Sequence, residues 1–236
     1  MKYIMRSVFI LILIFFIFPV IYSQFTISGA EPILDKLRMD KRMEGSNSTS
    51  YSDIVGDPYI YKDFFPGRII MKTGKTFQVD LRFDMHSNQI NFKEGDQIYT
   101  LLNPEKVAAI ELDTLRIIFS EYIKKAGDAV PEGSSYFILR LDGYCKLLIK
   151  RNVDVQDAEL PKLYQEAKPA EFVRMADDYY LIVGDDPAVR LSNKKDLSTI
   201  LNDHKNEIEK FIDSEKLGIK KIEDIIEIVN FYNSLV

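Results

Sequence analysis

The sequence predicts an α+β protein in which an antiparallel β-meander is followed by C-terminal helices. Three observations lead to this fold class. Apolar and polar residues alternate strictly in Thr76–Phe83, which is the pattern of a strand with one buried face. Turn-forming residues recur at short intervals, without helical stretches between them. From Ser192 onward, apolar residues recur every three or four positions, as in helices that cover a surface. The meander could form a rolled sheet, a half-barrel or a sandwich.

Composition and periodicity divide the chain into four segments. Residues 1–23 are expected to be a signal peptide, 24–55 a flexible N-terminal segment, 56–191 the antiparallel β domain, and 192–236 a helical segment packed on that domain. Within the β domain the sequence predicts these strands: Arg68–Met71, Thr76–Phe83, Gln89–Phe92, Gln97–Leu101, Val107–Leu112, Arg116–Phe119, Ser135–Leu141, Cys145–Val153, Tyr179–Val183 and Ala188–Leu191.

Two hairpins allow the register of neighbouring strands to be predicted. The turn at Lys72–Lys75 should place four apolar residues on one face: Ile69, Met71, Phe77 and Val79. At Asp142-Gly143, a two-residue loop would mix apolar and charged side chains on both faces. A bulged three-residue loop separates them and gathers five residues on one face: Phe137, Leu139, Cys145, Leu147 and Ile149. We therefore expect one continuous apolar face through the meander.

The ends of the helices are predicted from capping residues. Ser192 and Asp203 are expected N-caps, and Gly218 is expected to end the second helix in the left-handed conformation. A last helix should extend from Ile222 with apolar residues at spacings of three and four. The charged insertion Asp157–Lys168 is interpreted either as a helix or as a long loop.

The first residues have the composition of an export signal. Lys2 and Arg6 precede an apolar run at Val8–Tyr22, which is shorter than the roughly 20 residues that span a membrane. We expect cleavage after Ser23, with Ala30 as an alternative site and retention as an N-terminal anchor as another alternative. The sequence therefore predicts a periplasmic or extracellular protein.

Charge and cysteine content exclude some classes of protein. The net charge of −5 argues against a nucleic-acid partner, because phosphates demand basic patches. Cys145 is the single cysteine of the chain, so no internal disulfide can form and the core alone must hold the fold. No second long apolar run follows the N-terminal one, so no transmembrane span is expected in the mature chain.

Few residues suggest catalysis or metal binding. Asp84 and His86 would point the same way on an extended chain, so an Asp–His pair or a metal ligand is one interpretation, and a polar turn is the other. His204 is expected to be a structural residue beside an apolar stripe, and Cys145 an inert core thiol. Phosphate-loop, nucleophile-elbow and zinc-helix motifs are absent. The sequence therefore assigns no catalytic, cofactor-binding or metal-ligating residue and no cofactor.

Four short acidic or hydroxyl-containing motifs carry weaker hypotheses. The pairs Asp177-Asp178 and Asp185-Asp186 could hold calcium, but their spacing differs from a calcium loop and favours solvated turns. Asn47-Ser48-Thr49 matches an N-glycosylation sequon. Asp113-Thr114-Leu115 has the form of a short O-glycosylation signal of envelope bacteria.

Aromatic residues gather just before the predicted sheet. They are Tyr59, Tyr61, Phe64 and Phe65. One interpretation is that they cover the open end of the core, and the other is that they form an aromatic binding surface.

Six short motifs follow one another along residues 55–236. They are Gly56-x-Pro58-Tyr59, Phe65-x-Gly67, Gly74, Leu81-Arg82-Phe83-Asp84, Pro104-x-x-Val107 and Phe231-Tyr232-Asn233. In this order they resemble a group of uncharacterised secreted proteins common in Bacteroidota. The resemblance implies an envelope or extracellular setting and a β-rich domain with C-terminal helices. The group has no assigned activity, so the resemblance implies no functional residues.

These observations lead to three hypotheses of function. The first is a non-enzymatic binding or scaffold protein of the cell envelope whose partner is another envelope protein. The second is a carrier that encloses a lipid or other apolar ligand in a curved sheet. The third is a hydrolase that uses carboxylates or a metal and brings several acids to His86.

Overall fold

The computed structural model describes residues 51–160 and 167–236. Strands dominate up to residue 190 and helices follow, which confirms the predicted α+β class and the order of its two parts. The strands are β1 (Phe65–Met71), β2 (Thr76–Asp84), β3 (Gln89–Glu94), β4 (Gln97–Thr100), β5 (Val107–Leu112), β6 (Leu115–Ile123), β7 (Gly133–Leu141), β8 (Cys145–Lys150), β9 (Val153–Gln156), β10 (Glu171–Arg174), β11 (Asp178–Val183) and β12 (Ala188–Arg190). Residues 1–23, with their cleavage site, and the sequon at Asn47 lie outside the described residues.

The large sheet closes on itself at one end. Its strand order is β12-β11-β8-β7-β6-β5-β1-β2-β3-β4, and β12 also pairs in parallel with β6. The five strands β6, β7, β8, β11 and β12 therefore form a small closed barrel, and β5, β1, β2, β3 and β4 continue the sheet beyond it. Among the three predicted forms of the meander, a rolled and partly closed sheet is the one that the structure shows.

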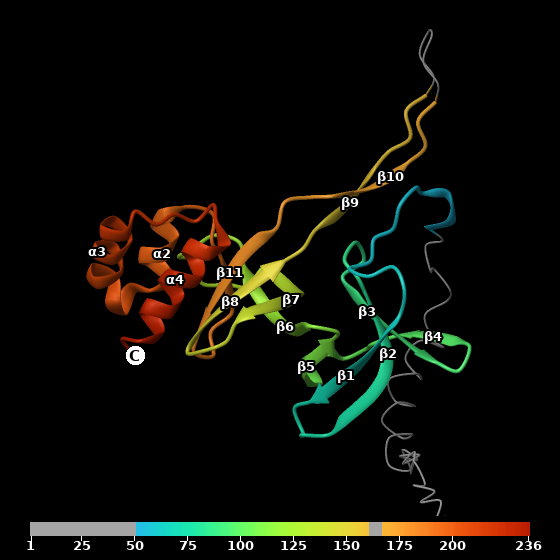
Figure 1. The fold of residues 1–236 in the computed structure, drawn as a ribbon, viewed down its shortest axis with the longest axis horizontal. Helices are drawn as coiled ribbons and strands as arrows, with labels where there is room; N and C mark the ends of the chain where they lie inside the picture. The colour runs from blue at the N-terminus through green and yellow to red at the C-terminus, as the bar shows by residue number, and fades with distance from the viewer. Residues whose placement is uncertain (1–50, 161–166) are drawn as a thin grey trace, which may run out of the picture.

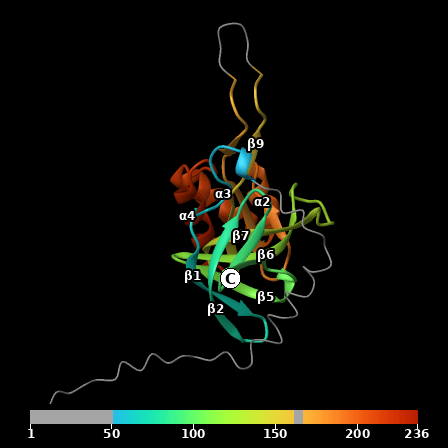
Figure 2. The ribbon, with the colours of Figure 1, turned by 90° about the vertical axis from the view of Figure 1, so that its right-hand side faces the viewer.

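Figure 1 shows how the other elements are placed around this sheet. The helices α2 (Lys194–Ile200), α3 (Lys205–Glu215) and α4 (Ile222–Asn233) gather at one end, beside β8 and β11. Strands β1–β5 lie at the opposite end. β9 and β10 form a separate two-stranded sheet, a ribbon that projects from the body, as Figure 2 also shows.

Three clusters of buried side chains hold the elements together, because β7 and β8 are apolar on both faces. One cluster lies over β1–β3 and β5–β7 and includes Ile69, Leu81, Ile90, Phe92 and Ile110. The second joins β8 and β11 to the helices and includes Cys145, Leu147, Leu181, Ile225 and Tyr232. The third fills the barrel and includes Phe137, Leu148, Tyr180, Ile182 and Ala188. The expectation of one continuous apolar face was therefore wrong.

The two predicted hairpin registers have different outcomes. The first is confirmed, since Ile69 pairs with Phe77 and the four predicted residues lie in the same cluster. The second is wrong. A bulge between Leu139 and Leu141 inserts an extra residue, so that Leu139 pairs with Leu148 instead of Leu147. Phe137 and Leu139 consequently face the barrel interior, whereas Cys145 and Leu147 face the helices.

Helix boundaries differ from the predicted caps by one or two residues. Asn193, and not Ser192, caps α2, and Asp196 completes a capping box by accepting two backbone N–H groups. His204, and not Asp203, precedes α3. Lys216 ends α3 in the left-handed conformation, with φ of 56°, in place of the predicted Gly218.

The charged insertion was predicted neither as a ribbon nor as part of a sheet. Where the structure describes it, Asp157–Lys168 continues the antiparallel path of β9 and β10, with a bridge between Glu159 and Lys168. β8 also stops at Lys150, three residues before the predicted end. Residues 51–55, placed in the flexible segment by composition, form a 3₁₀ turn at Tyr51–Asp53 and a bridge from Val55 to β10.

Candidate functional site

The projecting ribbon starts in the core, through Val153 and Phe172, and extends beyond it. It consists of β9, β10 and the described residues beyond them, 157–160 and 167–170. Glu159 and Lys168 exchange two backbone hydrogen bonds of 2.9 and 3.1 Å, and their side chains form an ion pair of 3.4 Å. Farther out, the Leu160 side chain is 87% exposed. At the opposite end of the ribbon, Met175 is 52% exposed beside a well-packed base.

An aromatic wedge fixes the base of the ribbon. Phe172 is only 7% exposed and contacts the rings of Tyr51 and His86, with centroid distances of 5.0 and 5.5 Å. Val153, on the paired strand, is buried in the same cluster. Because buried aromatic contacts each add stability beyond their burial, the ribbon is held firmly where it leaves the body.

Hydrogen bonds fix the same base from two sides. The Arg174 guanidinium donates to the Tyr59 carbonyl at 2.7 Å, which ties β10 to the segment before the sheet. Val55 lies alongside β10, where its N–H donates to Ala170 O at 2.8 Å and its carbonyl accepts from Phe172 N at 2.9 Å. The ribbon is thus supported on one edge by residue 55. Its other edge, β9, has no strand neighbour among the residues that the structure describes.

Asp84 and His86, for which an Asp–His pair was one interpretation of the sequence, both lie at this base but their side chains do not pair with each other. Asp84 is 4% exposed and accepts from the Tyr51 hydroxyl at 2.9 Å and from the backbone N–H groups of His86 and Ser87 at 3.0 Å each. His86 Nδ1 lies 3.2 Å from Val153 O, which can only accept, so Nδ1 carries the proton. The structure therefore agrees with the polar-turn interpretation.

Burial changes the acidity of the tyrosine in this group. The Tyr51 hydroxyl is partly buried and donates to the Asp84 carboxylate, and these two effects raise its pKa from 10.0 to about 12. The neutral phenol is the form that the site stabilises, because an ionised one would face a carboxylate. Tyr51 therefore acts as a hydrogen-bond donor that holds Asp84, with no tendency to act as a base near neutral pH.

The aromatic residues before the sheet separate into two groups. The Arg82 guanidinium lies over the Tyr59 ring at 3.7 Å and over the Phe64 ring at 4.3 Å. Tyr61 and Phe65 contact each other at 4.9 Å, and the Tyr61 hydroxyl donates to Asp113 at 3.2 Å. Their rings lie against other groups of the chain, and this agrees better with a cover for the core than with a continuous aromatic surface.

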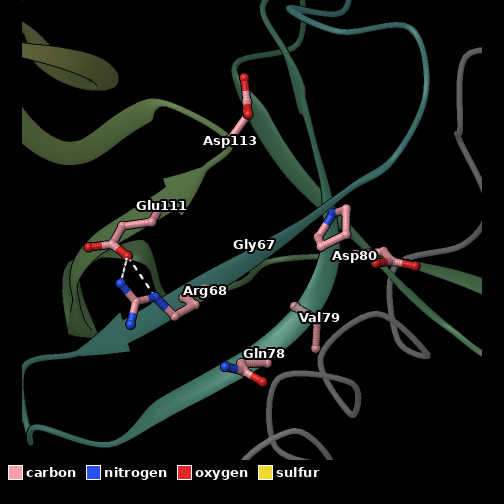
Figure 3. Close-up of a pocket in the computed structure, with 8 residues that line it drawn as sticks. Gly67, Arg68, Gln78, Val79, Asp80, Glu111 and Asp113 are labelled. Atoms are coloured by element: carbon pink, nitrogen blue, oxygen red, sulfur yellow. Dashed lines mark hydrogen bonds and ion pairs between the residues drawn. The ribbon is translucent and has the colours of Figure 1, made fainter.

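A groove of about 500 Å³ lies on the outer face of β1, β2 and β5. Figure 3 shows Arg68 and Glu111 joined across β1 and β5, with Gln78 and Asp80 on the neighbouring strand. The Arg68 Nε donates to Glu111 at 2.7 Å, so this cation is already paired. The lining is polar and charged, including Asp113 at the rim, which suits water or polar groups better than an apolar ligand.

The remaining candidate residues have structural roles. Cys145 is buried between β8 and α4, and burial raises its pKa to about 12, so the thiol stays protonated. His204 contacts the Tyr232 ring, with centroids 5.9 Å apart. Asp185 and Asp186 lie on an exposed turn.

The other acidic pair and the hydroxyl motif also have clear positions. Asp177 lies 3.9 Å from Arg151, whereas Asp178 pairs with Arg190 at 2.5 Å. Thr114 lies on the exposed two-residue turn between β5 and β6.

In residues 51–160 and 167–236, no three His, Cys, Asp or Glu side chains are grouped so that they could hold a metal ion. No helix in that part of the chain has the length and apolar character needed to cross a membrane.

The base of the ribbon could have been detected in part from sequence. Val153 and Val155 alternate with polar residues in β9, whereas the apolar residues Phe172 and Val173 are adjacent in β10, and each strand has only four residues. Such short alternation is too weak to separate from a loop.

Comparison with known proteins gives no match to a family model, to a curated protein or to a solved structure.

Proposed function

We propose that this chain is an exported, non-enzymatic binding protein of the cell envelope that presents its ribbon to another protein. The observation that carries the proposal is the contrast within the ribbon. Its base is fixed by Phe172, Arg174 and residue 55, whereas Leu160 near its far end is 87% exposed. A chain that fixes the base of an element firmly and leaves an apolar side chain of that element uncovered has the form of a docking protein.

The outer edge of β9, which has no strand neighbour among the described residues, defines the kind of partner. Two backbone groups of β9 are already engaged, since Val153 O lies 3.2 Å from His86 Nδ1 and Val155 N donates to the Asp154 carboxylate at 2.8 Å. The rest of this edge can pair with an extended segment of another chain, which adds to the ribbon as a further strand. Leu160 would then be covered by an apolar side chain of the same partner. The occupant is therefore a protein with an exposed extended segment, and not a small molecule.

The carrier hypothesis has less support. The barrel interior contains the rings of Phe137, Tyr180 and Tyr122 at centroid distances of 4.9 to 6.3 Å, so packed side chains occupy it. The groove on β1, β2 and β5 is polar. The hydrolase hypothesis required several acids to converge on the His86 side chain. The Asp84 carboxylate instead accepts from the Tyr51 hydroxyl and from the backbone N–H groups of His86 and Ser87, so the hypothesis has less support.

Export is proposed on the basis of the N-terminal sequence alone. The positive residues Lys2 and Arg6 and the apolar run after them support a signal peptide. N-terminal sequencing of the protein recovered from the periplasm or the medium tests it. We expect a mature chain that starts at Gln24, whereas recovery of the full chain in the membrane fraction would indicate a retained anchor.

A pair of matched substitutions tests the docking role. We expect Leu160→Asp to abolish a chemically cross-linked complex formed in intact cells, because it places a charge in the apolar contact. Val130→Asp is the control, since Val130 is 73% exposed on the β6–β7 connection, away from the ribbon. The proposal fails if both variants keep the complex, if both lose it, or if the wild-type chain forms none.

A further inference from the structure

We propose that the end of the barrel formed by Lys150, Arg190 and Lys124 binds an oxyanion, a phosphate or a carboxylate group. Strand register brings these side chains together. Lys150 is directly opposite Asp178 on β11, and Arg190 is opposite Tyr180, whose ring lies inside the barrel. This site is on a different part of the surface from the ribbon and does not depend on the ribbon's role.

At this end of the barrel, two of the three cations form ion pairs with carboxylates and, within the part of the chain that the structure describes, the third, Lys150, does not. Both carboxylate oxygens of Asp178 are engaged, because one lies 2.5 Å from Arg190 and the other accepts from Asn152 at 3.0 Å. Lys124 pairs with Glu132 at 2.9 Å. Among the described residues, no carboxylate oxygen lies within 4.0 Å of the Lys150 ammonium.

The Lys150 ammonium is held inside the barrel rim by an aromatic ring. Its Nζ lies 4.8 Å from the centroid of Tyr122, whose face attracts a cation only modestly. Lys150 is half-buried, and this burial lowers its pKa; the charge of Asp178 opposes the shift, and the charges of Lys124 and Arg190 add to it. An unpaired, partly desolvated ammonium is costly, and a bound anion would offset that cost.

The chemistry of the site limits the ligand. Three cations face two carboxylates, so this end of the barrel carries a local excess of positive charge in a chain whose net charge is −5. The rings of Tyr122 and Tyr180 meet at 5.9 Å and close the barrel beneath the ammonium. The anion must therefore bind at the rim, with its oxygen atoms toward Lys150 and the rest of its body in solvent.

Titration followed by amide NMR tests this proposal. Inorganic phosphate and acetate are added separately to the full mature chain at constant ionic strength, with chloride as the reference anion. We expect saturable shifts of the amides at 122–124 and 150–152 with at least one of the two anions, the stronger response showing which oxyanion the site prefers. Lys150→Met should raise the dissociation constant about tenfold, which corresponds to about 1.4 kcal/mol, and Lys150→Arg should restore it.

Lys93→Met is the matched control, because Lys93 is an exposed lysine on β3, at the other half of the sheet. It lowers the net charge by the same amount and should leave the titration unchanged. The proposal is overturned if neither anion gives a saturable shift, if Lys150→Met binds as tightly as the wild-type chain, or if Lys93→Met weakens binding equally. Spectra of each variant before titration show whether it is folded.

Discussion

Asp84 directs its carboxylate to groups that hold the chain in place. A hydroxyl from Tyr51 and two backbone N–H groups of the β2–β3 turn all donate to it. Buried carboxylates are also common in catalytic sites, so residue type alone suggested a site here. What decides the role is the set of partners, and sequence spacing does not reveal that Tyr51 is one of them.

For this single residue we predict that Asp84→Ala lowers the free energy of unfolding by about 2–4 kcal/mol, because three hydrogen-bond donors lose their acceptor at a buried position. Urea unfolding followed by circular dichroism measures it, since the chain has no tryptophan for fluorescence. Asp80→Ala on the same strand is the control, because Asp80 is exposed, and should change stability by less than about 0.5 kcal/mol. Equal effects would contradict the role of Asp84.

Tyr51 gives a prediction for alkaline pH. Its pKa is raised to about 12 in the folded chain, so its contribution to stability is complete below pH 10.0 and is lost as the pH rises toward about 12. The stability difference between the wild-type chain and Tyr51→Phe should therefore shrink over that interval. Urea unfolding at several pH values measures it, and a difference independent of pH would contradict the assigned hydrogen bond.

At the scale of secondary-structure elements, the features that could not be predicted from the sequence are short strands and a one-residue bulge. β2, which was predicted well, has one long alternation of apolar and polar residues between clear turns. β9 and β10 have four residues each, and their pairing joins segments separated by a charged insertion. The bulge in β7 is a second case, because a single extra residue reverses the face of every residue before it.

The anchor of the ribbon is predicted to depend on Phe172. Phe172→Ala removes a ring that contacts Tyr51 and His86, and we expect amide exchange in 153–156 and 171–174 to accelerate about tenfold or more. Hydrogen–deuterium exchange with mass spectrometry measures it. Val173→Ala is the neighbouring control on β10 and should leave exchange nearly unchanged. Uniform acceleration over the whole chain would instead indicate a general loss of stability.

One side chain of the last helix forms hydrogen bonds with the sheet, in addition to the apolar packing of α4 on β8 and β11. The Asn233 amide accepts from Cys145 N at 2.7 Å and donates to Cys145 O at 2.9 Å, so it satisfies the backbone of the first residue of β8. We predict that Asn233→Ala costs about 1–3 kcal/mol, measured by urea unfolding. Asn230→Ala on the exposed face of α4 should cost less than about 0.5 kcal/mol, and an equal cost would contradict the assigned role.

On the scale of the whole molecule, sequence pattern predicted the class and the order of parts but not the closure of the sheet. Closure rests on a parallel pairing of Ala188 and Val189 with the end of β6, across more than sixty residues of chain, and local alternation contains no signal for it. The candidate site was predicted only in part. Asp84 and His86 were singled out, but Phe172, Arg174 and Lys150 were not, because their roles arise from contacts between distant segments.

The central claim is that the ribbon contacts another protein, and site-specific photo-cross-linking tests it most directly. A photoreactive phenylalanine analogue is placed at Leu160 or at Val130, which are both exposed apolar positions, and the cells are irradiated. The account predicts one discrete adduct with another protein from position 160 and none from position 130. Equal adducts from both positions, or no adduct from position 160 in a folded and exported chain, would contradict it.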